Sequence, residues 1–541
     1  MYGFQTLQAR VDSRGEVLSR WDSIGLPFGL LALGLLLRCF NAWYRFLNAD
    51  EALHYLLSLQ SSFYATYRAS LTTAHPPLLI IWLHYWGMLV HSEFFLRLPC
   101  VVAGTLFCWI MFCWLRRVTD PTTALFALTM LLFSPALLQL SVELRQYSFL
   151  LLFCAASLYG LERAITEDSL PSLFASAIAL YLALLTHYSS LIFAMALGVY
   201  ALIRFSRSRV NGTFMVCWAG VQVLGVVLVS FLYASHISRI RVSGLAASIT
   251  DTYLSRSVLH PGQHWLWFVG RSNLRLFHYF FSQGAIGVAA LLLFVCGIVL
   301  LLRDSSSTDA SRKPSGRQLG FLFCFPLIIN CGLALFRLYP YGGTRHNSYL
   351  AIFVISAIAV ACARWERVRT LWKFVALLLV LTVCNLFPAP IDQYIRLRDQ
   401  NRKLMMDAVA ELRSLPPGST IFTDDQGGLL LSYYLCSNKV AQIEQSPFQP
   451  FMRSRCGEHS VISIDPDLWI FKAATFPHTL QRARQTYDLA PGTRLWLFQS
   501  GWFVDKEFAL REELKQFGCS APQEFGLNMF LCAIKVSGAT R

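Results

Sequence analysis

Charged residues are scarce in this sequence. Asp, Glu, Lys and Arg make up 14% of its 541 residues, whereas soluble globular chains carry about 25%. Hydrophobic residues make up 55%, and the mean hydropathy is +0.48. This composition excludes a water-soluble globular fold for most of the chain, which is expected to lie in a lipid bilayer.

Several motifs are also absent. The sequence contains no Cys-x-x-Cys pair, no P-loop and no Gly-x-Gly-x-x-Gly at a strand-to-helix turn, so zinc-finger and nucleotide-binding sites are not indicated. No cofactor is therefore predicted, and the sequence leaves open whether a divalent metal assists. The net charge of +15 is spread over short clusters between apolar runs; this is typical of membrane topology signals and argues against a nucleic-acid partner.

Long apolar runs dominate the first 388 residues. A membrane-spanning helix needs about 20 apolar residues, and helices satisfy their own backbone hydrogen bonds in lipid. We predict about 11 to 13 transmembrane helices, at residues 24–40, 76–91, 97–115, 122–140, 147–162, 172–186, 189–205, 214–234, 284–302, 319–337, 348–363 and 370–387. The first of these is expected to be a retained span and not a signal peptide, because no convincing cleavage site follows it.

Basic clusters between the runs predict the topology. The clusters around Arg204, Arg303 and Arg364 are expected to be cytoplasmic, because Lys and Arg in short loops are retained inside. The alternate loops then face outward. One conflict remains, since counting two full spans from an outward Asp50 places the basic pair Arg116 and Arg117 outside. Either a segment between residues 76 and 115 is re-entrant, or the rule fails there.

The composition changes at about residue 389. Charges return, and short β-type runs at 419–423, 461–464, 495–499 and 528–536 alternate with turn residues. We predict an all-α polytopic membrane domain over residues 1–388 and a soluble α/β domain over residues 389–541, on the non-cytoplasmic side. The basic, Ser-rich segment 304–317 is expected to be a cytoplasmic linker.

Four cysteines fall in this soluble tail. Cys436 with Cys456 and Cys519 with Cys532 are the sequence-nearest of three connectivities. Disulfides persist in oxidising compartments. The alternative is that all four are buried free thiols, as the many cysteines within the apolar runs would be.

An acidic pair, Asp50 and Glu51, directly follows the first apolar run. Acids at this position complement the dipole of a helix that begins here. A carboxylate at a membrane interface is also suited to be a general base that takes the proton of an attacking hydroxyl or amine. A third acid, Glu143, lies two residues from Arg145, and because these side chains diverge on a helix, each is expected to contact something else.

Cationic and aromatic residues precede or follow apolar runs on the same side. His75 comes before two prolines that open a helix. A glycine-containing turn precedes Arg345, His346 and Tyr349, and a guanidinium beside free amides suits a phosphate or pyrophosphate. These residues are expected at headgroup depth, where the phosphate of a lipid would lie.

Taken together, these motifs resemble the GT-C membrane glycosyltransferases, within them the protein O-mannosyltransferase and aminoarabinose-transferase-like group. The resemblance covers roughly residues 20 to 390 and depends on the order and spacing of short motifs: Asp50-Glu51, His75-Pro76-Pro77-Leu78, Phe95-Leu96-Arg97-Leu98-Pro99, Ala103-Gly104-Thr105, Ser134-Pro135, Thr186-His187-Tyr188, Arg345-His346 and Tyr349-Leu350.

The resemblance implies roles for these residues. Asp50, Glu51 and Glu143 are the expected catalytic acids, with Asp50 as the base. Relatives that carry an acid where this chain has Tyr147 imply that Glu143 takes over that role. The residues expected to bind the donor phosphate or substrate are His75, Arg145, His187, Tyr188, Arg345, His346 and Tyr349.

The function expected from this resemblance is transfer of a sugar from a polyprenyl-phosphate donor to a lipid, glycan or protein acceptor on the outer face of a membrane, with inversion. The expected location is the bacterial inner membrane, with the site facing the periplasm. Two alternatives are a polytopic transporter, which would show inverted repeats and charges at mid-span, and a lipid-linked glycan ligase or polymerase.

Overall fold

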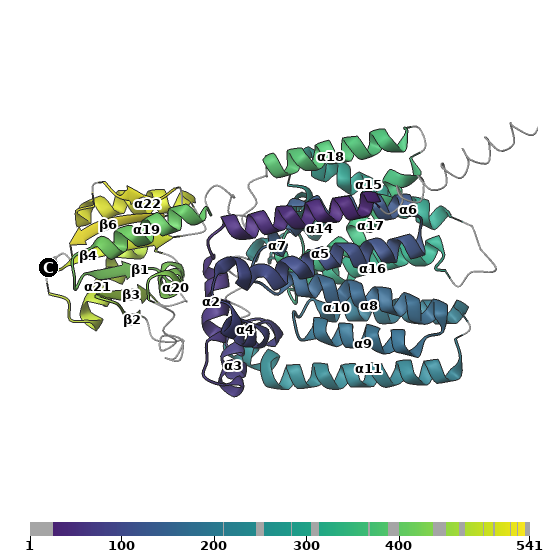
Figure 1. Cartoon of the computed structure of the whole chain (residues 1–541), viewed down its shortest axis with the longest axis horizontal. Coiled ribbons are helices and arrows are strands. Elements are labelled where there is room, and N and C mark those ends of the chain that lie inside the picture. The colour runs from purple at the N-terminus through teal and green to yellow at the C-terminus, as the bar shows by residue number, and fades with distance from the viewer. Residues whose placement is uncertain are drawn as a thin grey trace, which may run out of the picture.

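The computed structural model describes residues 25–208, 210–244, 254–282, 284–304, 313–365, 368–387, 400–436, 451–464, 471–490, 492–500, 504–519, 521–526 and 529–535. It contains a long helical bundle and a smaller α/β unit at one end of that bundle (Figure 1). The expected fold class is confirmed. The predicted boundary at 388/389 and most of the predicted linker 304–317 lie outside the described residues.

The helical part begins with an unlabelled helix, Gly25–Tyr44. The other α-helices of this part are α2 (Ala49–Ser58), α3 (Phe63–Ser70), α4 (Leu78–Leu89), α5 (Glu93–Val118), α6 (Pro121–Phe133), α7 (Pro135–Ser141), α8 (Tyr147–Glu167), α9 (Leu170–Leu184), α10 (Ser190–Ser208), α11 (Gly212–Leu232), α12 (Ser238–Val242), α14 (Trp265–Phe281), α15 (Gly284–Arg303), α16 (Gly316–Leu335), α17 (Ala351–Arg364) and α18 (Thr370–Leu386). A π-helical turn, η1 (Tyr233–Ile237), joins α11 to α12, and two 3₁₀ turns are η2 (Ser255–Ser257) and η3 (Arg345–Leu350).

Among the described residues, eight helices are long and apolar enough to cross a membrane, and the bent pair α6 and α7 would make a ninth. The chain is therefore an integral membrane protein. The shorter apolar helices α9 and α18 run alongside the long ones (Figure 1). Including them brings the bundle to the lower end of the 11 to 13 helices expected from the sequence.

The predicted span at 76–91 is wrong. Only residues 78–89 form α4, which is 12 residues long and too short to cross about 30 Å of hydrocarbon. It lies at the end of the bundle that faces the soluble unit (Figure 1), where the Leu78 amide bonds to the Leu185 carbonyl at the end of α9, at 3.1 Å, and Glu93, just after α4, pairs with Arg402 of the soluble unit. The prolines before α4 thus open an interfacial helix.

This correction resolves the topology conflict. Arg117 pairs with Glu167 at the end of α8, at 2.8 Å. At the same end of the bundle, Gln318 bonds to the Ile203 carbonyl, and Arg364 pairs with Asp304. The basic clusters, including Arg116 and Arg117, therefore gather at the end opposite the soluble unit. Figure 1 shows these helices lying side by side along the bundle.

The kink between α6 and α7 has an identifiable cause. Pro135 has no amide hydrogen for the Leu131 carbonyl, and the helix bends by 61° at this point. Arg38, fully buried in the first helix, donates to the Leu132 carbonyl at 3.0 Å and to that of Leu131 at 3.5 Å. Asn385 donates to the Phe133 carbonyl at 2.8 Å. These side chains satisfy carbonyls that the break leaves without helical partners.

The soluble unit is a three-layer α/β domain. Its strands are β1 (Thr420–Thr423), β2 (Phe451–Cys456), β3 (His459–Ile464), β4 (Arg494–Ser500), β5 (Gln523–Glu524) and β6 (Met529–Lys535), in the order β2-β3-β1-β4-β6-β5. Strand β1 pairs in parallel with β3 and β4, and the other pairs are antiparallel.

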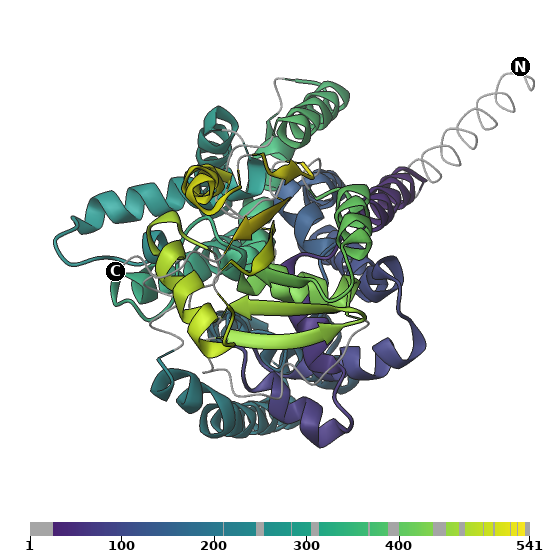
Figure 2. The same cartoon turned by 90° about the vertical axis from the view of Figure 1, so that its left-hand side faces the viewer.

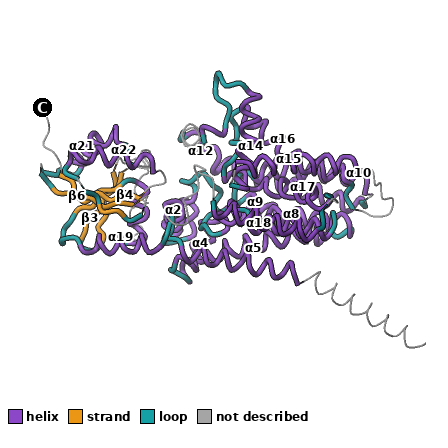
Figure 3. Tube along the Cα trace, turned by 90° about the horizontal axis from the view of Figure 1, so that it is seen from above, coloured by secondary structure: helices purple, strands orange, loops and turns teal. Residues whose placement is uncertain are grey.

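Helices cover both faces of the sheet (Figure 3). Helices α19 (Arg402–Ser414) and α20 (Asp425–Tyr434) share one apolar core with β1, and α21 (Phe476–Thr486) and α22 (Val504–Leu514) share the other. Viewed along the bundle, the sheet lies in front of the purple α2–α4 segment (Figure 2). Both predicted disulfides, Cys436–Cys456 and Cys519–Cys532, are formed.

Candidate active site

Asp50 lies at the start of α2, at the end of the bundle that faces the soluble unit. Asn48 caps this helix, and its side chain accepts from the Glu51 amide at 3.0 Å. The carboxylate of Asp50 is paired with Arg145 and lies 2.9 Å from Nη2 of Arg345. Two guanidiniums from distant parts of the sequence therefore converge on one acid.

Glu51 points elsewhere, because successive residues on a helix are about 100° apart. Its carboxylate receives two hydrogen bonds from Arg97, at 2.7 and 2.6 Å, and is fully buried. It also accepts from the Leu144 amide at 2.7 Å and closes the capping box with Asn48. All these bonds hold the structure around Asp50, so the contacts favour a positioning role for Glu51. Its predicted catalytic role stays a prediction.

Three histidines and a tyrosine form a ring cluster beside Asp50. The ring centroids of His75 and His187 are 5.2 Å apart in a stacked arrangement, and those of His187 and His346 are 5.5 Å apart. The ring of Tyr147 lies 5.4 Å from that of His187 and 6.3 Å from that of His346. Three residues expected to bind the donor, His75, His187 and His346, are thus neighbours although they come from three distant segments of the sequence.

His54 adds a fifth ring. It is four residues after Asp50 on α2, and its ring lies 6.3 Å from that of His75. Burial, followed by the charge of Arg145, lowers the pKa of His54 to about 3. The histidine therefore faces the arginines as a neutral ring at physiological pH.

The charge state of this cluster follows from burial and from the arginines. Burial lowers the pKa of His187 to about 3 and that of His75 well below its ordinary value. Burial alone would raise the pKa of Asp50, but the positive charges of Arg145 and Arg345 outweigh it and hold that pKa well below its usual range. An ionised carboxylate, two guanidiniums and neutral imidazoles are the result.

The turn before η3 determines where Arg345 lies. Gly342 has φ of 120°, and a Cβ at Gly343 would lie 2.5 Å from the Arg275 carbonyl oxygen. Only glycine fits both requirements without strain or a clash. The Tyr341 hydroxyl anchors the turn to α14 by donating to Asn273 at 2.7 Å.

Glu143 lies in the irregular turn between α7 and α8, where Gln139 donates to it at 2.6 Å. Gln139 in turn accepts from Arg45. The second carboxylate oxygen of Glu143 is buried and has no hydrogen-bond partner among the described residues. As expected, Glu143 and Arg145 do not pair with one another, because Arg145 pairs with Asp50.

The structure does not bring the two remaining predicted residues, Tyr188 and Tyr349, into the ring contacts of this cluster. The Tyr188 hydroxyl bonds to Nδ1 of His236 at 2.6 Å, and Nε2 of His236 lies 2.8 Å from the Thr73 carbonyl. Tyr349 is fully buried, and its hydroxyl has no hydrogen-bond partner within the part of the chain that the structure describes.

Sequence reasoning missed three contributors. His54 could have been found from its four-residue spacing to Asp50, which places both on one face of a helix. Tyr147 was read as the site of a missing acid, yet its ring belongs to the cluster. Arg97 belongs to a motif on which the resemblance depends, but its ion pair with Glu51 has no sequence signal, because it joins two helices that are far apart in the sequence.

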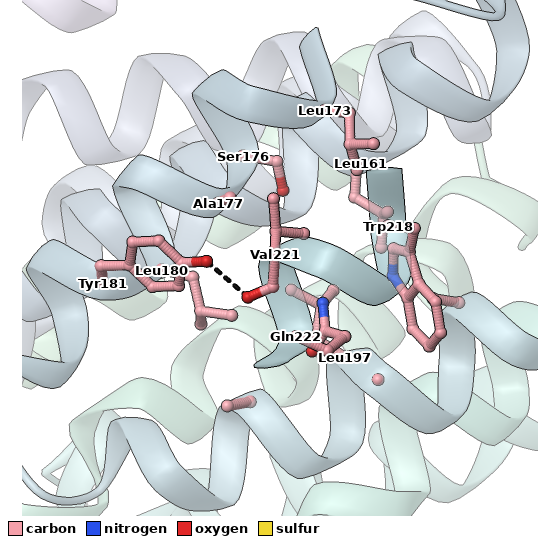
Figure 4. Close-up of a pocket in the computed structure, with 13 residues that line it drawn as sticks. Leu161, Leu173, Ser176, Ala177, Leu180, Tyr181, Leu197, Trp218, Val221 and Gln222 are labelled. Carbon is pink, nitrogen blue, oxygen red and sulfur yellow. Dashed lines mark hydrogen bonds between the residues drawn. The ribbon is translucent and has the colours of Figure 1, made fainter. Parts of the chain in front are cut away.

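No group of three or more His, Cys, Asp or Glu residues in the described ranges is arranged to hold a metal ion. A separate groove lies between α8, α9, α10 and α11 and encloses about 380 Å³, including space open to the outside (Figure 4). Its lining is mostly apolar, as with Leu161, Leu197 and Trp218, and none of the predicted site residues lines it.

Comparisons with known proteins show what part of the chain, and its fold, are similar to. Residues 74–233 match the family described as dolichyl-phosphate-mannose-protein mannosyltransferase. No curated protein matches the sequence. Among solved structures, ArnT from Cupriavidus metallidurans in the apo state matches with a TM-score of 0.51 and 13% identity, over 95% of this chain and 99% of that one.

The same enzyme bound to undecaprenyl phosphate matches with a TM-score of 0.50 and 13% identity, over 95% of this chain and 99% of that chain. At this identity the likeness concerns the fold. The chain thus has the fold of the GT-C membrane glycosyltransferases, and the resemblance expected from its motifs is confirmed.

Proposed function

We propose that this protein is a membrane glycosyltransferase that moves a sugar from a polyprenyl-phosphate carrier to an acceptor, with Asp50 as the general base. The observation that carries the proposal is the pairing of the Asp50 carboxylate with both Arg145 and Arg345. A carboxylate and two guanidiniums beside neutral rings contain the groups needed to bind a phosphate and to accept a proton.

The arginines have two roles in this proposal. In the ligand-free protein they neutralise Asp50 and hold its pKa low, so the acid is a weak base. A carrier phosphate competes for the same guanidiniums, since Arg pairs with phosphate in a charge-assisted geometry. When the guanidiniums turn to the phosphate, they no longer lower the basicity of Asp50. Donor binding and base activation are thereby coupled.

In the transfer step, one bond to the anomeric carbon forms while another breaks. The acceptor oxygen or nitrogen attacks the anomeric carbon from the face opposite the phosphate, and Asp50 takes the acceptor proton. The bond between the anomeric carbon and the phosphate oxygen breaks, and the phosphate leaves with the electron pair, stabilised by Arg145 and Arg345. This displacement inverts the anomeric centre.

The neutral histidines suit a different task. His75 and His187 carry no charge at physiological pH because their pKa values are lowered by burial. Each neutral imidazole offers one N–H donor and one acceptor, which suits sugar hydroxyls or phosphate oxygens. We assign the charge that binds phosphate to the arginines, and orientation of the donor to His75, His187 and His346.

We further propose that the site faces the non-cytoplasmic side. The basic ends of the helices, including Arg116 and Arg117, gather at the end opposite Asp50, and such ends stay in the cytoplasm. Two disulfides in the soluble unit suit an oxidising compartment. The bacterial inner membrane, with the site toward the periplasm, fits these features.

The likeness to a structure bound to undecaprenyl phosphate supports a lipid-phosphate carrier as donor. A lipid, glycan or protein could each present the attacking group, and the sugar is equally open. A transporter, the alternative from another class, receives no support from the fold.

The test uses the purified full chain in lipid nanodiscs. Binding of unglycosylated polyprenyl phosphate is measured first, followed by transfer from a panel of radiolabelled polyprenyl-phosphate hexoses and pentoses. Asp50→Asn should retain carrier binding and lose transfer by at least about 100-fold. The matched control is Asp407→Asn, an exposed residue of α19. Absence of carrier binding by the wild type, or full transfer by Asp50→Asn, refutes the proposal.

A further inference from the structure

The backbone just before Asp50 is held from one side by the membrane bundle. Arg97 of α5 donates to the carbonyl oxygens of Ala42, Arg45 and Phe46 at 3.0, 2.6 and 2.8 Å. The same guanidinium binds Glu51, so a single fully buried side chain fixes both the turn and the first helical residues after it.

The soluble unit holds the same turn from the other side. The Phe46 amide donates to the Gln400 carbonyl at 3.0 Å, and the Gln400 side chain donates back to the Phe46 carbonyl at 3.0 Å. One residue on, the Leu47 amide donates to the hydroxyl of Tyr434 at 2.8 Å. Tyr434 is the last residue of α20, in the soluble domain.

The Tyr434 hydroxyl is also a donor. It bonds to the carboxylate of Glu93 at the start of α5, and Arg402 pairs with that carboxylate at 3.3 Å. One tyrosine hydroxyl therefore joins three parts: the last turn of α20, the first residue of α5 and the amide of Leu47. Its neighbour Tyr433 makes a different contact, to the His91 carbonyl at 3.1 Å.

A disulfide fixes the end of the helix that carries Tyr434. Cys436 lies two residues after Tyr434 and is bridged to Cys456, the last residue of β2. Both cysteines are buried, and β2 is an edge strand of the sheet. The second bridge, Cys519–Cys532, belongs to the opposite core, behind the sheet.

We propose that α20 is a docking helix that positions Asp50 through Tyr434, and that the Cys436–Cys456 disulfide keeps this helix in its docked position. The expected consequence is that the protein transfers sugar at its full rate only while this disulfide is intact, and this consequence rests on the proposed function. The soluble domain then acts as a positioning element, although the candidate site residues lie in the membrane domain.

Reduction releases the constraint. A dithiol reductant breaks the S–S bond between Cys436 and Cys456, two S–H groups form, and the dithiol is oxidised to its own disulfide. The end of α20 is then no longer tied to β2 by a covalent bond, and the Tyr434 hydroxyl is less often within reach of Leu47. Carrier binding should change little, because Arg145 and Arg345 lie outside this linkage.

The two disulfides provide a matched pair of variants. In the full chain in nanodiscs, Cys436→Ser/Cys456→Ser should lower kcat about 10-fold with the donor KM within twofold of the wild-type value. Cys519→Ser/Cys532→Ser should leave kcat within twofold. Equal losses in the two variants, or no loss in the first, overturn the proposal.

Tyr434→Phe separates positioning from loss of stability. It removes the hydroxyl that contacts Leu47 and Glu93 and should lower kcat to a similar extent when assayed well below its thermal midpoint, where the variant is still folded. Tyr433→Phe, its neighbour on the same helix, should retain wild-type turnover. Because Tyr434→Phe already lacks the contact, treatment with the dithiol should lower its turnover no further. An additional tenfold loss on reduction would show that the disulfide acts by another route.

Hydrogen exchange of the backbone amides gives a readout that does not depend on sugar transfer. Peptides covering residues 44–58 should exchange faster after Cys436→Ser/Cys456→Ser and after Tyr434→Phe, but not after Cys519→Ser/Cys532→Ser or Tyr433→Phe. If this pattern appears in a protein that transfers no sugar, the docking is supported and the proposed function fails. Unchanged exchange in the first two variants overturns the docking itself.

Discussion

Nη2 of Arg345 lies 2.9 Å from Oδ2 of Asp50, and both side chains remain partly accessible, at 16% and 20% of their surface. Asp50 comes from the second helix of the bundle and Arg345 from the turn before α17. An ion pair that is neither sealed nor fully solvated can be opened by a competing anion. In the proposed function, this pair is the position at which a carrier phosphate would bind.

We expect Arg345→Ala to weaken the binding of polyprenyl phosphate about 10- to 100-fold, because a hydrogen bond to a charged group contributes about 1.5–3 kcal/mol. The measurement is a binding isotherm with the unglycosylated carrier in nanodiscs. Arg345→Lys should recover only part of the affinity, since lysine offers a point charge without the planar fork of arginine.

The control for this prediction is Arg271→Ala, which removes an exposed arginine from α14. Unchanged carrier affinity in Arg345→Ala, together with a lowered thermal midpoint, would assign Arg345 a purely structural role.

A second prediction separates the two adjacent acids. Glu51→Ala leaves the buried guanidinium of Arg97 without its carboxylate, and breaking a buried pair in this way costs about 3–5 kcal/mol. We expect a strongly lowered thermal midpoint or loss of expression. Asp50→Asn should lower the midpoint less, because Asp50 is partly exposed and the oxygen of the asparagine amide can still accept from the arginines. Scanning fluorimetry of both variants decides, and equal midpoints would contradict the distinct roles.

Much of the candidate site could be predicted from the sequence, because its residues follow or precede apolar runs at one interface. Their positions next to apolar runs predicted a common depth in the membrane for Asp50, His75, Arg145 and Arg345. The sequence could not reveal which of the two acids, Asp50 or Glu51, faces Arg97, since this depends on how α2 packs against α5. Contacts between distant helices are set by packing, for which a single sequence holds no signal.

The secondary structure was likewise predicted only in part. Strands β1, β3, β4 and β6 were predicted within two residues of their ends from β-type runs. Strand β2 and the two-residue strand β5 were missed, since their charged residues give no apolar alternation. The apolar run of α4 was mistaken for a span because hydropathy does not distinguish an interfacial helix from a crossing one.

A third prediction concerns Arg38. Replacing it by Met leaves the Leu131 and Leu132 carbonyls without donors at the kink, and each unsatisfied buried acceptor costs about 1–3 kcal/mol. We expect a clearly lowered thermal midpoint. Adding Pro135→Ala should recover part of the loss, because the restored amide can bond to Leu131 again. If Arg38→Met is as stable as wild type, the carbonyls have other partners.

The last prediction concerns Asp424, the fully buried N-cap of α20. Its carboxylate accepts from the Gly427 amide at 2.8 Å and from Gln499 at 3.3 Å. These bonds favour the ionised form, but burial outweighs them and raises the pKa of Asp424 to about 7. In the unfolded chain the pKa of an aspartate is about 3.9.

The sign of the pH dependence follows from proton binding. Between about pH 4 and 7 the folded domain keeps a proton that the unfolded chain releases, so the free energy of unfolding falls as pH rises through this window. The loss is on the order of 4 kcal/mol, complete above about pH 7. Asp424→Asn cannot ionise, and once the Gln499 amide flips, the asparagine amide can donate to Oε1 of Gln499, a buried acceptor without a hydrogen-bond partner in the described ranges. Relative to wild type, this variant should therefore gain stability at pH 8 and little at pH 4.5.

Hydrogen exchange of peptides covering residues 420–436 at the two pH values measures the difference, with Asp407→Asn as the exposed control. An equal effect of Asp424→Asn at both pH values would mean that the carboxylate is already ionised in the folded domain.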